Sequence, residues 1–250
     1  MLFRSKPQGM LYQNMYQAGY VAGEFSAEKG EYNHGEFIEL DRGFDFYAPQ
    51  TTIDKQGRRI LVAWMSVPEQ DEQDHPTIDY KWLHCMTIPR ELKLIGEKVY
   101  QVPLPEYEQL RTGKVLTYDV ELEKESIELE GIEGKAIELQ LDNLSLTAGW
   151  MDLSIGDGGR VIYSTEQKVL TLERKSYVDG TIEKRQCFLD ELKSLRIFID
   201  TSSIELFVNG GQETFTARLY PSPNRSVVRF SASKKASFSL RKWDLNKVVL

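Results

Sequence analysis

The amino-acid sequence predicts an all-β protein. Apolar and polar residues alternate in short runs along most of the chain, and Gly, Asn and Asp interrupt these runs. Alternation with a period of two is typical of strands buried on one face, whereas amphipathic helices repeat their apolar residues every three to four positions. Helical periodicity is almost missing, and the turns recur at the spacing expected of a β-sandwich or a β-propeller.

Two hairpins show the pattern well. In the first, strands at Thr51–Asp54 and Ile60–Met65 flank the turn sequence DKQG, whose Asp and Gly favour a tight reversal. In the second, the runs LRIFID and SIELFVNGG lie on either side of a short polar turn. Alternation here places five apolar side chains toward a core: Ile197, Ile199, Ile204, Leu206 and Val208.

The segment Pro103–Arg111 departs from the alternating pattern. It carries two prolines followed by good helix formers, which predicts a short helical connector that begins near a proline. We therefore divide the chain into residues 1–102, a linker at 103–113, and residues 114–250. Most of the unusual local motifs lie upstream of this linker, so we expect a functional site there or at the junction.

The composition limits the classes of partner. A formal net charge of −7, with Lys and Arg scattered among acidic residues, argues against a nucleic-acid partner. No apolar run reaches the roughly 20 residues of a membrane-spanning helix. The N-terminus also lacks the apolar core of a signal peptide. We therefore expect no membrane partner and a cytoplasmic location.

Cysteine and histidine spacing predicts no metal site. Cys85 and Cys187 are far apart, which gives neither a disulfide framework nor a ligand pair. His34, His75 and His84 have no Cys, Asp or Glu at metal-ligand spacing, so we interpret all three as structural or solvated residues.

Three blocks of sequence, found in the family's order, resemble glycoside hydrolase family 32. The first is ELDRGFDFYAPQTTIDKQGRRILVAWM at Glu39–Met65, similar to the segment in which a D-F-Y-A motif precedes a hairpin ending in Trp. The second is HCMTIPRELKL at His84–Leu94, and the third is the stretch around SSIELFVNGG within Arg196–Pro221. Leu11–Gly23 further resembles the intracellular bacterial branch, whose members hydrolyse sucrose 6-phosphate.

The resemblance implies a fold and a reaction. Residues 1–102 would form the C-terminal remnant of a five-bladed β-propeller, namely the end of blade four and blade five, and residues 114–250 would form a β-sandwich. Family members are retaining β-fructosidases that act through a covalent fructosyl-enzyme intermediate, and the substrate would be sucrose or sucrose 6-phosphate. No cofactor is implied.

The sequence departs from the family at the residues that carry out catalysis. The family's nucleophile is the Asp of an N-D-P-N-G motif, and its acid/base is the Glu of an E-C pair. This sequence contains neither motif and no R-D-P motif. Retaining cleavage needs two carboxyl groups about 5 Å apart, so we expect no catalytic residue in this chain and no activity from the chain alone.

Three residues are candidates for the wall of the fructosyl pocket, by resemblance. Tyr47 and Asp45 belong to the D-F-Y-A segment, which in the family enters the central channel of the propeller. Trp64 ends a strand that points at the same channel, where an apolar ring suits the C–H face of a sugar. The alternative is that these residues pack within a blade as ordinary core side chains.

A second interpretation is a binding module. Residues 114–250 would then form a carbohydrate-binding or subunit-assembly β-sandwich without hydrolase activity, although Trp150 and Trp243 are isolated within alternating strands. An incomplete propeller also leaves an open flank with unpaired strand edges. We therefore expect the first hundred residues to dock on the sandwich, to self-associate through this flank, or to be partly disordered.

Overall fold

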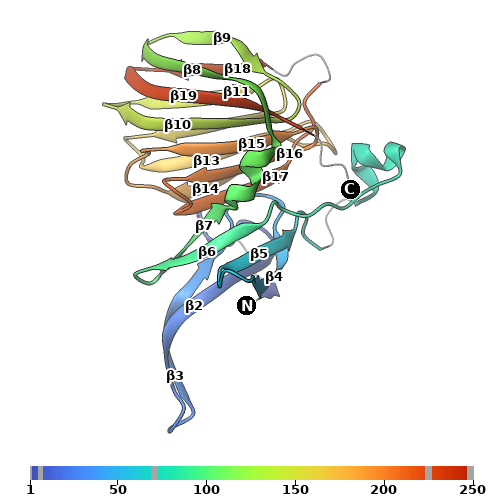
Figure 1. Cartoon of the computed structure of the whole chain (residues 1–250), viewed down its shortest axis with the longest axis vertical. Helices are drawn as coiled ribbons and strands as arrows, with labels where there is room; N and C mark the ends of the chain where they lie inside the picture. Colours follow the sequence, from blue (N-terminus) through green and yellow to red (C-terminus); the bar gives the residue numbers. More distant parts are fainter. Residues whose placement is uncertain (1, 5–7, 69–71, 223–226, 247–250) are drawn as a thin grey trace.

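The computed structural model describes residues 2–4, 8–68, 72–222 and 227–246, and these residues form an all-β structure, as predicted (Figure 1). In the first part of the chain, a three-stranded antiparallel sheet contains β1 (Leu2–Arg4), β2 (Tyr16–Ser26) and β3 (Glu31–Glu39). A four-stranded antiparallel sheet follows, with β4 (Tyr47–Ile53), β5 (Arg59–Trp64), β6 (Arg90–Ile95) and β7 (Lys98–Pro103).

Two six-stranded antiparallel sheets make up the second part. The order in one is β17 (Glu213–Arg218), β16 (Ser203–Val208), β15 (Leu195–Asp200), β10 (Ile137–Leu146), β19 (Lys235–Leu245) and β8 (Arg111–Glu123). The order in the other is β14 (Ile182–Phe188), β13 (Val169–Lys175), β12 (Gly159–Ser164), β11 (Trp150–Ile155), β18 (Val227–Ala232) and β9 (Ser126–Glu133).

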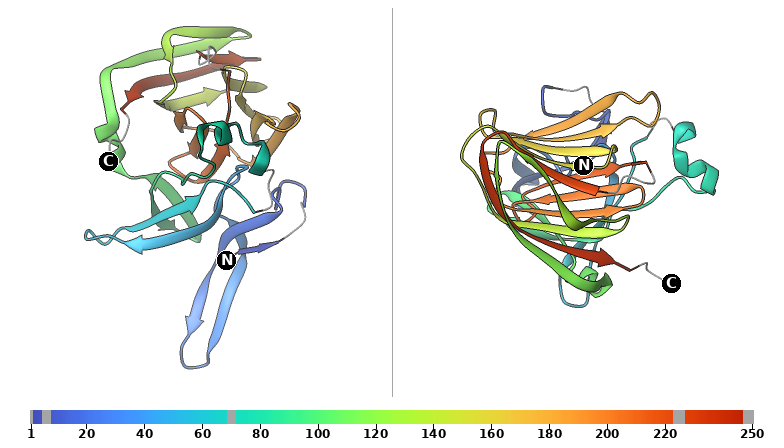
Figure 2. Two further views of the ribbon diagram at one scale, coloured as in Figure 1. Left: turned by 90° about the vertical axis from the view of Figure 1, so that its right-hand side faces the viewer. Right: turned by 90° about the horizontal axis from the view of Figure 1, so that it is seen from above.

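The two six-stranded sheets enclose the main hydrophobic core and lie face to face in Figure 2. The five predicted core residues of the β15–β16 hairpin are all buried in this core. Leu153, Leu172 and Phe230 meet them from the opposite sheet. Each fully buried Leu or Ile contributes roughly 1.5–3 kcal/mol, so this cluster is the main source of stability.

The predicted hairpins and the connector are confirmed. Strand β4 pairs with β5, and β15 pairs with β16. In the first turn, Asp54 Oδ1 accepts hydrogen bonds from the backbone N–H groups of Gln56 (3.0 Å) and Arg58 (2.9 Å), which is why Asp suits this position. The connector is the 3₁₀ helix η3 (Pro105–Leu110), with proline in its first turn.

The remaining helices are also short 3₁₀ turns. They are η1 (Glu72–Asp74) and η2 (Pro76–Tyr80), which lie in the excursion between β5 and β6. Across the described residues, none of the helices has the length and apolar character needed to cross a bilayer.

The residue before η2, His75, fixes this excursion to the second part of the chain. The residue is only 3% exposed. Nδ1 lies 2.9 Å from the Tyr220 hydroxyl, and Nε2 lies 3.1 Å from the Tyr177 hydroxyl. Burial, together with the nearby guanidinium groups of Arg218 and Arg174, lowers the pKa of His75 to about 4. His75 is therefore a structural residue.

The depressed pKa of His75 predicts an acid-sensitive contribution to stability. Unfolded His titrates near 6.5, so the unfolded chain binds the proton more readily than the folded chain does. The contribution is complete above about pH 6.5 and is lost as the pH falls toward 4. Between pH 7 and pH 4.5, we expect the unmodified protein to lose up to about 3 kcal/mol more unfolding free energy than His75→Gln loses. Urea denaturation of both proteins at the two pH values measures this difference, and equal losses would contradict it.

Candidate functional site

Tyr47 and Trp64, two of the three predicted site residues, are brought together. They form a cross-strand pair between β4 and β5, and both are half-buried. Tyr16 on β2 packs against Tyr47 with ring centroids 5.8 Å apart. The Trp64 indole Nε1 donates a hydrogen bond to His84 Nδ1 at 3.2 Å. The result is a group of four aromatic residues from three separate stretches of chain.

Strand β4 is irregular directly after Tyr47. The β4–β5 register shifts between Tyr47 and Gln50, and Ala48 has a φ of 46°. This left-handed conformation is unfavourable for a residue with a Cβ. Bulges of this kind re-aim side chains and are common beside active sites. The D-F-Y-A segment therefore carries local strain at the candidate site.

The third predicted residue, Asp45, contacts both six-stranded sheets instead. Its side chain is fully buried. Oδ2 accepts hydrogen bonds from Arg174 Nη1 at 2.6 Å and from the Arg218 backbone N–H at 2.7 Å. Burial raises the pKa of Asp45, and the Arg174 guanidinium opposes that effect. Asp45, two residues before Tyr47, is thus held against both β13 and β17.

The segment that contains Asp45 closes the open edge of β17. Asp41 Oδ1 accepts the Thr216 backbone N–H at 2.8 Å, as Asp45 accepts that of Arg218. Asp45 N–H in turn donates to the Thr216 carbonyl at 3.1 Å. Gly43 lies so close that a Cβ there would overlap the Thr216 backbone. Two carboxylates and a glycine thereby satisfy an edge that would otherwise be unpaired.

The edge of the opposite sheet is closed in a similar way. The Gln13 side-chain amide donates to the Gln186 carbonyl at 2.6 Å and accepts from the Gln186 backbone N–H at 2.9 Å, which mimics one step of strand pairing on β14. Asn14 Oδ1 accepts a hydrogen bond from Arg185 Nε at 2.7 Å. Of the outcomes expected for the first hundred residues, the described part of the chain shows docking on the sheets.

Arg90 links the first part of the chain to the second. Its side chain is fully buried on β6. It donates to Glu205 at 2.5 Å, Thr216 Oγ1 at 2.6 Å, Gln101 Oε1 at 2.9 Å and Asp41 at 3.1 Å. A buried guanidinium needs paired acceptors of this kind to offset its desolvation. Arg90 lies in the block HCMTIPRELKL. Its partners on other strands could not be predicted from that block, because they are distant in the sequence.

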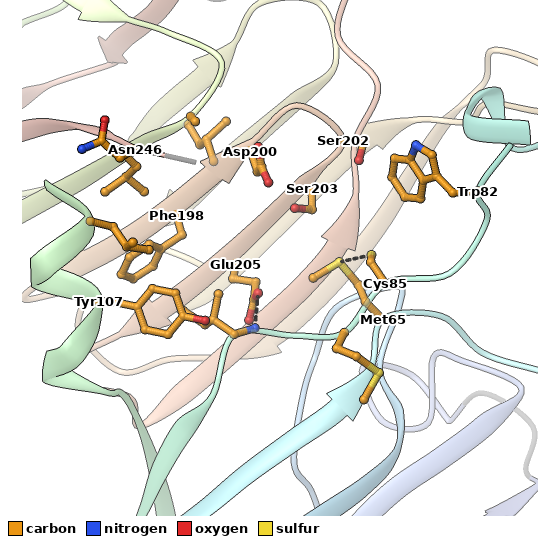
Figure 3. A pocket seen from close by; sticks show the side chains of 16 residues that line it. Met65, Trp82, Cys85, Tyr107, Phe198, Asp200, Ser202, Ser203, Glu205 and Asn246 are labelled. Carbon is orange, nitrogen blue, oxygen red and sulfur yellow. Dashed lines mark hydrogen bonds between the residues drawn. The ribbon is translucent and has the colours of Figure 1, made fainter. Parts of the chain in front are cut away.

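A cavity of about 510 Å³ lies at the junction between η3, the β15–β16 hairpin and the chain that follows β5 and η2 (Figure 3). Two carboxylates line it. Glu205 uses both oxygens, accepting from the Ile88 N–H at 2.8 Å and from Arg90. Asp200 is exposed and accepts the Thr201 N–H at 2.7 Å. Both oxygens of Glu205 are therefore held by donors of the protein, whereas Asp200, among the described residues, accepts only from the neighbouring Thr201.

The side chains that could bind metal do not gather in the described ranges, where no group of three or more His, Cys, Asp or Glu residues is arranged to hold an ion. Cys85 and Cys187 are both free thiols. The aromatic group itself offers half-buried ring faces at Tyr47 and Trp64.

The fold is shared with solved enzymes of glycoside hydrolase family 32. The chain is similar to the solved family 32 β-fructofuranosidase of Bombyx mori, with a TM-score of 0.77 and 29% identity, covering 97% of this chain and 50% of that chain. It also shares its fold with the sucrose-6-phosphate hydrolase of Lactobacillus gasseri, with a TM-score of 0.76 and 24% identity, covering 95% of this chain and 49% of that chain.

The chain belongs to glycosyl hydrolases family 32. The family's N-terminal domain model matches residues 1–103, and its C-terminal domain model matches residues 106–244. The sucrose-6-phosphate hydrolase of Bacillus subtilis (strain 168) is 42% identical over 237 residues, which is 95% of this chain and 49% of that protein. That of Salmonella typhimurium is 39% identical over 221 residues, 86% of this chain and 44% of that protein. The chain thus spans about half the length of these relatives.

Proposed function

We propose that this chain is the C-terminal portion of a retaining β-fructosidase that hydrolyses sucrose or sucrose 6-phosphate. The observation that carries the proposal is the match to both family domains, end to end along the chain. Relatives named sucrose-6-phosphate hydrolase support the substrate class. A cytoplasmic location and the absence of a cofactor belong to the same proposal.

Within the proposal, residues 1–102 form the end of propeller blade four and blade five, 103–113 the linker, and 114–250 the sandwich. Strands β4 to β7 support this division, because they pair in sequence order as a four-stranded antiparallel meander, which is the pattern of one propeller blade. The outer flank of such a remnant exposes strand edges that favour self-association of the isolated chain.

Tyr47 and Trp64 would form part of the fructosyl pocket wall. The Trp64 ring offers an apolar surface to the C–H face of the sugar, and the Tyr47 hydroxyl offers a hydrogen bond. Asp45 would contribute by holding the start of β4 against Arg174. The nucleophile and the acid/base would come from sequence that the relatives have and this chain does not match, since retaining cleavage requires two such carboxyls.

A chimera tests the proposal. The part of the Bacillus subtilis sucrose-6-phosphate hydrolase that this chain does not match is fused to residue 1, so that this chain replaces the matched half. We expect the chimera to release glucose 6-phosphate from sucrose 6-phosphate. We expect Trp64→Ala in the chimera to lower kcat/KM by about tenfold or more, the equivalent of about 1.4 kcal/mol of transition-state binding.

The matched control is Trp150→Ala. Trp150 lies on β11, inside the six-stranded sheet whose edge strands are β14 and β9, so this substitution should leave kcat/KM unchanged. An inactive but folded chimera, beside an active relative assayed in parallel, would refute the proposed function. Equal effects of the two Trp substitutions would refute the role of Trp64.

A further inference from the structure

The junction cavity of Figure 3 is separate from the proposed fructosyl site. Trp64 is the last residue of β5, and Met65 follows it in a bend. Trp64 meets Tyr47 and His84, whereas Met65 lines the cavity. His84 and Cys85 divide in the same way, since His84 contacts Trp64 and Cys85 lines the cavity. The lining of the cavity includes neither Tyr47, Trp64 nor His84, so the two sites are built from different residues.

The cavity has aromatic walls on two sides. In Figure 3, Trp82 lies at one side, Tyr107 and Phe198 lie at the other, and Asp200 and Ser203 lie between them. The Arg218 guanidinium packs over the Trp82 ring at 5.0 Å, yet Trp82 remains 41% exposed. A ring that is held from one side and open on the other is a platform for a flat apolar face.

Several polar groups of the lining have no protein partner. Within the described residues, the side-chain hydroxyls of Ser202, Ser203 and Tyr107 make no hydrogen bond to the protein, and neither does the Trp82 indole N–H. Burial and the nearby Glu205 raise the pKa of Tyr107 to about 12, so its hydroxyl stays a donor. A pocket with apolar walls and a few convergent polar groups is the usual form of a small-molecule site.

The charge of the lining selects against anions. Glu205 is neutralised by Arg90, while Asp200 at the rim is exposed and has no cationic partner among the described residues. The described residues that line the cavity include no Lys or Arg. A phosphate group at the rim would therefore meet the Asp200 carboxylate, with no cation in the described lining itself to offset it, since Arg218 is buried behind the Trp82 ring.

We propose that this cavity binds a neutral sugar without cleaving it. The sugar would place its C–H face on Trp82 and its hydroxyls against Ser203 and Asp200. The volume of about 510 Å³ is within the range of ligand pockets, roughly 300–1,000 Å³. This binding is independent of the proposed hydrolysis and requires only the residues present in this chain.

Calorimetric titration of the full chain with sucrose and with sucrose 6-phosphate tests the inference. We expect millimolar binding of sucrose and weaker binding of the phosphorylated sugar. Trp82→Ala should weaken sucrose binding by about tenfold or more, about 1.4 kcal/mol. Trp150→Ala is the matched control, because Trp150 is 39% exposed on the second part of the chain, and its binding should match that of the unmodified protein.

Asp200→Asn provides a second readout that does not depend on the stacking platform. Removing the rim charge should bring the affinity for sucrose 6-phosphate closer to that for sucrose. Thermal unfolding of each variant checks that the fold is intact. The inference would be overturned if sucrose gave no binding heat at 20-fold excess over about 1 mM, or if binding were lost in Trp64→Ala but kept in Trp82→Ala.

Discussion

Replacing Arg90 with Met is expected to lower the free energy of unfolding by about 3–5 kcal/mol. The substitution keeps an apolar side chain of similar length but leaves Asp41 and Glu205 buried without their guanidinium partner. An uncompensated buried charge is far more costly than the loss of an exposed ion pair. Urea denaturation of the two proteins at neutral pH measures the difference.

The control for this prediction is Arg58→Met. Arg58 pairs with Asp54 and Glu106 at the surface, where ion pairs contribute about 0–1 kcal/mol. Adding Glu205→Gln to Arg90→Met should restore part of the lost stability, because one of the two unpaired carboxylates is then neutral. A loss below about 1 kcal/mol for Arg90→Met would show that the buried pair does not hold the junction together.

Replacing Gly43 with Ala is expected to cost about 3 kcal/mol, the upper end of the usual cost of overpacking. The new methyl group would overlap the backbone of Thr216, and neither backbone segment can move without breaking the hydrogen bonds that close the edge of β17. Hydrogen exchange should show faster exchange of the Thr216 and Arg218 amides in this variant.

Gly35→Ala is the matched control, since the nearest atom to a Cβ there is the Ala22 carbonyl oxygen at 3.8 Å. It should change stability by less than about 0.5 kcal/mol. If Gly43→Ala were as mild as Gly35→Ala, the close contact between the D-F-Y-A segment and β17 would not exist in solution.

The hairpins and the core were predictable because they depend on local patterns. A period of two placed Ile204, Leu206 and Val208 in the core, and the structure confirms all three. The same period predicts that the intervening Glu205 and Phe207 face solvent, yet they are 3% and 2% exposed. The first part of the chain covers that outer face, and alternation along one strand carries no information about a partner more than a hundred residues away.

For the candidate site, too, the local pair was predictable and the distant partners were not. Tyr47 and Trp64 face each other because the hairpin that joins them is local. Tyr16 reaches the same place from β2 and His84 from the chain between η2 and β6, and no spacing rule linked them to Trp64. Asp45 also has its partner, Arg174, on a distant strand. The pocket-lining role of Tyr47, Trp64 and Asp45 stays a prediction that the chimera tests.

The junction connects the two six-stranded sheets to the proposed site. Asp45 is fixed by Arg174 and by the backbone of Arg218, and Tyr47 follows it by two residues. A shift of this anchor would move Tyr47 relative to the rest of a sugar pocket. The second part of the chain therefore supports the geometry of the first.

The most direct test is to incubate the purified 250-residue chain with sucrose 6-phosphate and to measure glucose 6-phosphate. We predict no release above the protein-free blank, since the sequence contains neither the N-D-P-N-G motif nor the E-C pair that carry the attacking aspartate and the proton-donating glutamate of the family. Protein-dependent release that disappears when Asp200 or Glu205 is replaced would contradict the account, because it would place a working acid pair inside this chain.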